Sequence, residues 1–161
     1  MDGWWHEIYK TIIAEFSDLP TAVEFTRVIL RLAIAAILGA LLGLEREHSG
    51  KAAGVRTHML VAVGAAIFVL VPQQMQMPDA EVSRVIQGVI TGVGFLGAGT
   101  ILKSTSEETV KGLTTAAGLW LTAAVGIAAG LGREGSAVLS AFLAFVILHL
   151  VPKILPKGTP H

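Results

Sequence analysis

The 161-residue chain contains no cysteine and little charge. Without cysteine there are no disulfides, no thiolate metal ligands and no cysteine nucleophile. Charged residues make up only 15% of the sequence, the formal net charge is zero, and the lysines and arginines are scattered. Nucleic-acid-binding proteins carry a concentrated basic surface. The composition therefore predicts no nucleic-acid partner.

Hydrophobic residues, in contrast, are abundant. They make up 53% of the chain, and the mean hydropathy is +0.67. A soluble domain of this length cannot bury that much apolar surface, so the composition predicts a membrane protein in contact with the lipid bilayer. A cleavable signal peptide is not expected, because the N-terminus carries Trp4, Trp5, Glu7 and Glu15 instead of a basic end followed by an apolar run.

The first twenty residues differ from the rest. Apolar residues recur at spacings of three and four, which predicts a short amphipathic helix over residues 4–19 that lies in the membrane interface. Pro20 interrupts this pattern, and the sequence from Thr21 to Glu24 has the T-x-x-E form of a capping box. The apolar stripe consists of Trp5, Ile8, Ile12, Phe16 and Leu19.

Five apolar stretches follow, and they predict an all-α, polytopic membrane helix bundle over residues 21–152, with a short tail at 153–161. The second stretch is expected to end at Pro72 and the fifth at Pro152, while Pro78-Asp79 is expected to form the turn and cap that start the third. The stretches are 23–44, 57–71, 82–102, 110–131 and 135–151.

The basic residues are distributed unevenly between the two sides of such a bundle. With five crossings, the loops 45–56 and 103–111 and the C-terminal tail share one side. By the positive-inside rule this side is cytoplasmic, so the N-terminus is expected outside. The basic residues on the cytoplasmic side are Arg46, Lys51, Arg56, Lys103, Lys111, Lys153 and Lys157, and those on the other side are Lys10, Arg27, Arg84 and Arg133.

The stretch GVGFLGAG at 92–99 matches G-x-G-x-x-G, the dinucleotide-binding pattern. It lies inside an apolar stretch, without a preceding strand and turn or an acidic residue about twenty positions later, so no nucleotide and no other cofactor is predicted. Small residues instead let membrane helices approach closely. One alternative stays open, namely that the third helix breaks here to line a cavity. The predicted packing residues are Gly88, Gly92, Gly94, Gly97, Gly99, Gly126 and Gly130.

No catalytic or metal site is predicted, because the five histidines are dispersed and the acids fall in loops or at helix ends, where the pairs Glu45/Glu47 and Glu107/Glu108 are expected to be solvated. Arg46 and Arg56 flank the first cytoplasmic loop, where Arg56 either pairs with Glu45 in a stapled loop or binds an anion such as a headgroup or phosphate. Arg31 either snorkels to the outer interface or pairs with an acid from another helix. Thr57, next to Arg56, belongs to the same cytoplasmic set. The remaining polar candidates are Gln87, Thr91, Thr114, Thr115 and Thr122, for which interhelical hydrogen bonds are expected rather than substrate binding.

Four segments of the sequence form a recognisable set: GLERE at 43–47, GVRTHMLVAVGAAIF at 54–68, GVGFLGAGTI at 92–101 and GLTTAAGLWLTAAVGIAAGLG at 112–132. Together they resemble the MgtC/SapB family of bacterial inner-membrane proteins. The resemblance implies a five-helix bundle with the N-terminus in the periplasm and the C-terminus in the cytoplasm. It also implies a link to low magnesium, stress and virulence, with modulation of an F-type ATP synthase or P-type magnesium pumps. Many members continue into a soluble domain, whose functions are not carried over to this chain.

Three functional hypotheses follow. The first is a non-enzymatic modulator that acts by helix–helix contact in a homo-oligomer or with a partner complex. The second is a transporter or channel for magnesium or another small solute, built on a broken third helix. The third is a lipid or anion sensor based on Arg46 and Arg56.

Overall fold

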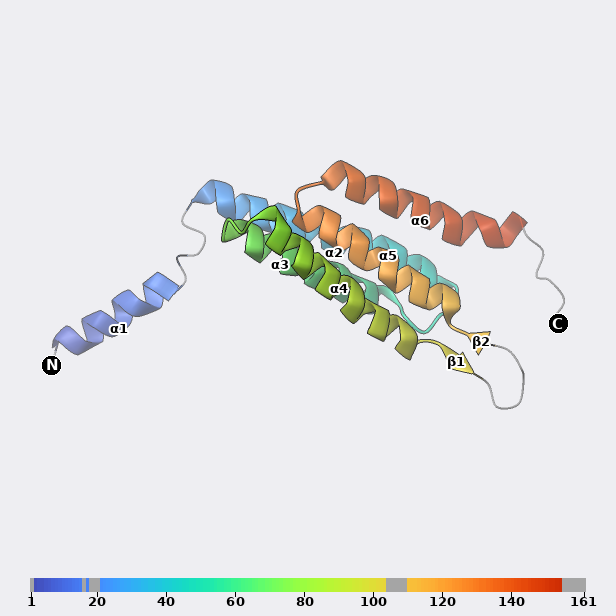
Figure 1. Cartoon of the computed structure of the whole chain (residues 1–161), viewed down its shortest axis with the longest axis horizontal. Helices are drawn as coiled ribbons and strands as arrows, with labels where there is room; N and C mark the ends of the chain where they lie inside the picture. Colours follow the sequence, from blue (N-terminus) through green and yellow to red (C-terminus); the bar gives the residue numbers. More distant parts are fainter. Residues whose placement is uncertain (1, 16, 18–20, 104–109, 155–161) are drawn as a thin grey trace. The chain divides into compact units, whose positions relative to one another are not determined.

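The computed structural model describes residues 2–15, 17, 21–103 and 110–154, and divides into two units, residues 1–30 and 31–161 (Figure 1). In the first unit, helix α1 spans Asp2–Glu15. Both tryptophans are exposed, Trp4 by 67% and Trp5 by 65%. Part of this prediction lies outside the described residues, namely Phe16 and Leu19 of the apolar stripe and Pro20, which interrupts it.

Helix α2 spans Ala22–His48 and begins in the first unit. The backbone N–H of Glu24 donates to Thr21 Oγ1 at 3.1 Å, and the Thr21 hydroxyl contacts the Glu24 carboxylate at 3.2 Å. The predicted capping residues therefore do satisfy a free N–H group at the start of this helix.

The second unit completes the bundle. The described residues hold five helices long and apolar enough to cross a membrane, as the sequence predicts. After α2 these are α3 (Val55–Gln74), α4 (Asp79–Gly99), α5 (Leu113–Gly130) and α6 (Glu134–Ile154).

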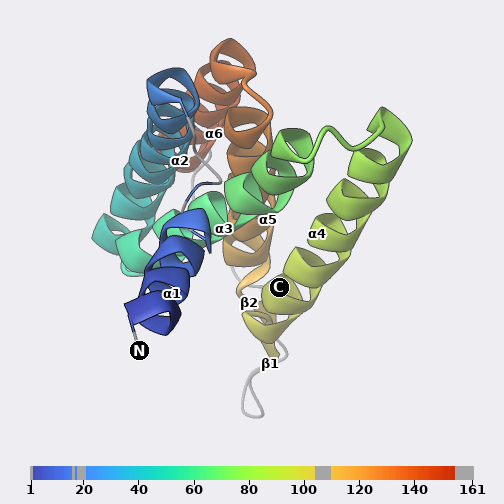
Figure 2. The same ribbon diagram turned by 90° about the vertical axis from the view of Figure 1, so that its left-hand side faces the viewer.

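Helix α5 is the centre of this unit. It packs against α3, α4 and α6, and Figure 2 shows it between α6 and α4. One core cluster joins Ala35 and Leu38 of α2 to alanines of α3, α5 and α6. A second joins α3, α4 and α5 around Val69, Val93 and Ala123. Alanine and glycine dominate these contacts, because helices in lipid associate through close backbone approach.

Two predicted helix ends are wrong. Pro72 and Pro152 lie inside α3 and α6, which continue to Gln74 and Ile154. Each proline lies in the last turn of its helix, so it removes only one backbone hydrogen bond, close to the residue where the helix ends. The carbonyl of Pro72 itself accepts from the N–H of Met77 at 3.0 Å.

The predicted third and fourth stretches are too long at their facing ends. Leu102–Lys103 (β1) and Val110–Lys111 (β2) form a short antiparallel pair instead. Gly112 then adopts φ +98°, and a Cβ there would collide with the carbonyl of Thr100. This left-handed glycine turns the chain from β2 into α5.

Helix α4 begins at Asp79, where Pro78-Asp79 predicts a start. The first turn is closed by the Pro78 carbonyl, which accepts from Glu81 and Val82, rather than by a side chain. The helix is continuous through GVGFLGAG to Gly99. The structure therefore gives no support to a broken third span.

Candidate functional site

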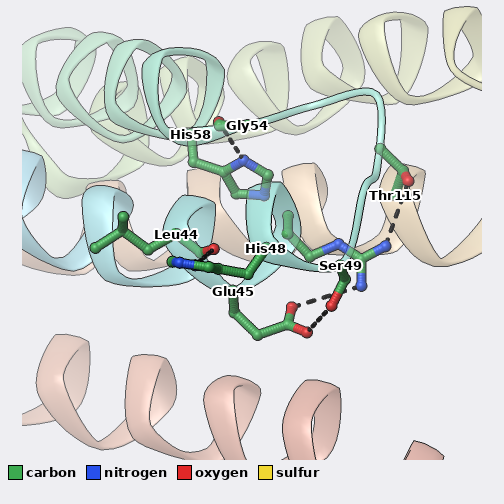
Figure 3. A network of polar contacts seen from close by, with 8 residues as sticks. Leu44, Glu45, His48, Ser49, Gly54, His58 and Thr115 are labelled. Carbon is green, nitrogen blue, oxygen red and sulfur yellow. Dashed lines mark hydrogen bonds and ion pairs between the residues drawn. The ribbon is translucent and has the colours of Figure 1, made fainter.

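A buried polar cluster lies where the C-terminal end of α2 meets α3 and α5 (Figure 3). Glu45 and Arg46 of α2 are 9% and 4% exposed, His58 of α3 is fully buried, and Thr115 of α5 is 4% exposed. Buried charges are rare in proteins and costly without partners. This cluster is therefore the first candidate for a functional site.

The two charges of the cluster are incompletely paired. Arg46 Nη1 lies 3.6 Å from Glu45 Oε2, and its Nη2 lies 3.5 Å from Thr115 Oγ1, so both contacts are long. Glu45 Oε1 accepts a shorter hydrogen bond from Ser49, at 2.8 Å. Among the described residues, Glu45 Oε2 and Arg46 Nε have no hydrogen-bond partner. The pair is thus held together by charge more than by hydrogen bonds.

His58 has its tautomer fixed by its neighbour. Its Nδ1 lies 3.1 Å from the carbonyl oxygen of Gly54, which can only accept, so Nδ1 carries the proton. In a neutral ring Nε2 is then an acceptor, and within the described part of the chain it has no partner. Nε2 faces α5 at Gly118, where an added Cβ would lie 3.7 Å away. The cluster therefore presents a buried acceptor toward α5.

Glycines allow α2 to approach α3 closely enough to bury these groups. A Cβ at Gly39 would lie 2.8 Å from the carbonyl of His58, and one at Gly43 would lie 2.5 Å from Val55 Cα. The Glu47 carboxylate of α2 also accepts from the N–H of Val55 at 2.9 Å, which caps the first turn of α3. The GLERE segment therefore joins two consecutive helices as well as supplying the charged pair.

The structure brings together only part of the predicted cytoplasmic set. Glu45 contacts Arg46, not Arg56, and Arg46 reaches Thr115. Arg56, Thr57 and Thr114 are exposed and stand outside the cluster. The expectation of a solvated Glu45 is wrong, because its side chain packs between helices.

Sequence reasoning missed His58, Ser49 and the capping role of Glu47. A signal for His58 was present in the sequence. It precedes Ala62, Ala65 and Val69 at spacings of four, three and four, a stripe of small and apolar residues that marks the buried face of α3.

The polar residues of α4 are placed differently. Gln87 and Thr91 are exposed, and the Thr91 hydroxyl donates to the carbonyl of Gln87 at 2.9 Å. On α5 the buried Thr122 hydroxyl likewise donates to the carbonyl of Gly118. The expected interhelical bonds are not made by these two threonines, because each hydroxyl is satisfied by its own helix.

The predicted packing glycines fall into two groups. A Cβ at Gly126 or Gly130 would collide with the carbonyl of Ala62 or Ala66, so α5 lies against α3 there. A Cβ at Gly97 would meet Ala116 at an ordinary contact distance. No described atom lies within 4 Å of a Cβ placed on the remaining four, Gly88, Gly92, Gly94 and Gly99.

Gly88 and Gly92 line an apolar groove of about 640 Å³ between α3 and α4. Exposed Leu60 and Phe68 lie on its α3 side, and Leu96 lies on its α4 side. The groove leaves one flank of α4 uncovered by the described part of this chain.

Arg31 makes two hydrogen bonds that neither of its two sequence-based alternatives names. Its Nη1 donates to the carbonyl of Gly130 and to Gln73 Oε1, both at 2.9 Å. It thus binds the C-terminal end of α5, where the helix dipole and free carbonyls favour a cation. A carbonyl ligand of this kind cannot be recognised from residue types.

No group of three metal-ligating side chains occurs among the described residues.

The family model described as MgtC family matches residues 32–156. The chain is 43% identical to protein SrpB of Synechococcus elongatus over 73% of this chain and 71% of SrpB. It is 42% identical to protein MgtC of Salmonella typhimurium, over 79% of this chain and 51% of that protein. It is 37% identical to YhiD of Escherichia coli K12, provisionally named a magnesium transporter, over 76% of this chain and 59% of YhiD. No solved structure matches.

Proposed function

Because this chain belongs to the MgtC family and its described residues hold five helices long and apolar enough to span a membrane, it is a multi-pass membrane protein, and we propose that it is a non-enzymatic modulator of other membrane complexes. It acts through helix–helix contacts, in a homo-oligomer or with a partner, and serves magnesium homeostasis and stress or virulence adaptation. The family resemblance names an ATP synthase or a P-type ATPase as partner. The chain spans about half of protein MgtC, so these roles concern the membrane part.

The observation that carries this proposal is the uncovered polar face of α4. Gln87, Thr91, Gly94 and Ala98 recur at spacings of four, three and four, and all four are exposed. Gln87 lies eight residues after the start of α4, about 12 Å along the helix at 1.5 Å per residue. That depth lies within the roughly 30 Å hydrocarbon core.

An amide at this depth is poorly accommodated by lipid. Hydrocarbon offers no hydrogen-bond partner, and a side-chain hydrogen bond to another membrane helix is worth about 0.6–2 kcal/mol. The amide of Gln87 both donates and accepts, and the small residues below it let a second backbone approach. The face therefore suits another transmembrane helix, including α4 of a second copy.

The proposal places the protein in the bacterial inner membrane, with the N-terminus periplasmic and the C-terminus cytoplasmic. The seven basic residues on the predicted inner side support this orientation.

Cross-linking in membranes tests the contact. The chain has no cysteine, so Gly94→Cys provides a single reactive thiol on this face. We expect oxidation to join the thiols of two copies into a disulfide-linked dimer, and a thiol-to-amine cross-linker to capture a partner complex instead. Adding Gln87→Leu should lower the yield severalfold, whereas Thr114→Val, which removes an exposed hydroxyl on α5, should not. If Gln87→Leu and Thr114→Val gave equal yields of cross-linked product, α4 would not be the contact face.

The relative provisionally named a magnesium transporter keeps transport as the second candidate. Reconstituted protein should give no more magnesium influx than protein-free liposomes. Flux above that level would replace the modulator with a transporter.

A further inference from the structure

A polar pocket opens at the end of the bundle opposite the buried cluster, where α3 ends, α4 begins and α5 turns into α6. Its volume is about 380 Å³. Gln73, Asp79, Ser83 and Arg133 supply its polar lining, while Val82, Ile86 and Leu131 close its side toward the bundle. In the predicted orientation this pocket lies at the periplasmic membrane surface.

The polar groups of the pocket have opposite charges that do not neutralise each other. Within the described residues, neither Asp79 nor Arg133 takes part in an ion pair. Gln73 is oriented by Arg31, whose guanidinium donates to Gln73 Oε1 at 2.9 Å. Since arginine only donates, the amide nitrogen of Gln73 is left to donate elsewhere. The pocket thus offers a cation and an N–H donor beside a separate carboxylate.

A second, apolar cleft of about 180 Å³ lies next to this pocket, between α4 and α5. Ile86 lines both spaces, and Ile90 and Val93 follow it on α4. On α5, Ile127 lies one turn from Leu131, and Trp120 closes the far end. From Ile86 to Val93 the cleft runs about 10 Å at 1.5 Å per residue, within one leaflet of the roughly 30 Å core.

A polar pocket at the membrane surface above an apolar cleft matches the two parts of a phospholipid. We propose that this site binds a zwitterionic aminophospholipid of the phosphatidylethanolamine type. Arg133 and the Gln73 amide bind the phosphate, Asp79 binds the ammonium group, and the first part of one acyl chain lies against Ile86 and Ile90.

Charge complementarity selects this occupant over the other membrane lipids. Asp79 would repel the headgroup region of an anionic lipid such as phosphatidylglycerol, which brings no compensating cation. A trimethylated choline headgroup has the charge but no N–H to donate to the carboxylate. Free phosphate would leave the apolar cleft unfilled. The site is separate from the outward face of α4 that carries Gln87, so this inference does not depend on the proposed function.

Native mass spectrometry of the purified full chain with added phosphatidylethanolamine, phosphatidylglycerol or phosphatidylcholine tests the site. We expect phosphatidylethanolamine to bind most tightly. Asp79→Asn should abolish its preference over phosphatidylglycerol, and Arg133→Gln should lower binding of both by about fivefold, the effect of about 1 kcal/mol. Glu81→Gln and Arg84→Gln, which change charges on the same turns of α4 outside the pocket, should have no effect.

The cleft is tested separately with Ala124→Leu, which fills it without touching a charge. This change should weaken binding of all three lipids while leaving the Gly94→Cys cross-link intact. Equal affinity for the three lipids, or pocket variants that behave like their controls, would overturn the proposal. Loss of lipid binding in the controls Glu81→Gln and Arg84→Gln would also overturn it, because binding would then depend on net charge and not on the pocket.

Discussion

At the scale of single residues, the buried pair of Glu45 and Arg46 is the most demanding feature of the molecule. Both side chains lie between helices, and their contact of 3.6 Å is long. A buried ion pair adds little net stability, but removing one partner leaves an uncompensated charge. The stability of the fold should therefore depend on keeping both residues or replacing both.

Arg46→Met should destabilise the protein by about 3 kcal/mol, because it leaves the Glu45 carboxylate buried with Ser49 as its described partner. The double variant Glu45→Gln/Arg46→Met should recover at least half of that loss. Thermal unfolding in detergent, followed for the two single variants and the double variant, measures the coupling.

Arg56→Met is the matched control, because Arg56 is exposed and outside the cluster. It should change stability by no more than about 0.5 kcal/mol. If Arg46→Met proved as harmless as this control, the cluster would be too well hydrated to act as described.

At the scale of helices, glycines have two different roles that sequence alone cannot separate. Gly126 and Gly130 let α5 lie against the backbone of α3, whereas Gly88 and Gly92 face an open groove. Both pairs show the same G-x-x-x-G spacing. Only the partner across the interface distinguishes them.

Gly126→Ala should therefore destabilise the bundle, because its Cβ would collide with the carbonyl of Ala62. Gly88→Ala has the same chemistry without a neighbour, and should stabilise α4 by about 0.5–1 kcal/mol through better helix propensity. The thermal midpoints of the two variants give the comparison. Equal shifts would show that α3 and α5 are further apart than in this structure.

The helices themselves were predictable because each span is a local property of length and hydropathy. The residues at which the helices begin and end were less predictable. Pro72 and Pro152 look like terminators but occupy last turns, and the β1–β2 pair depends on the left-handed conformation of Gly112. Burial of Glu45, and the binding of Arg31 to the end of α5, depend on which helix faces meet. That information is tertiary and is not present in residue spacing.

At the scale of the whole molecule, the predicted orientation can be tested without background labelling, because the chain has no cysteine. In intact cells, an impermeant maleimide should label Met75→Cys and Gly135→Cys, which replace exposed residues near the predicted outer ends of α3 and α6. Lys51→Cys and Lys153→Cys should react only after the cells are opened. The reverse pattern would invert the topology and place the lipid pocket in the cytoplasmic leaflet.

The central position of α5 also has a consequence for synthesis of the protein. The chain is made from its N-terminus, so α3 enters the membrane before α5 exists. Until α4, the β1–β2 pair and α5 have followed, Ala62 and Ala66 lack the glycine face of α5 that covers them in the finished bundle. Assembly of α2, α3 and α4 therefore remains incomplete until the fourth span is inserted, and ribosome-bound chains that stop after α4 should be more sensitive to protease than chains that stop after α5.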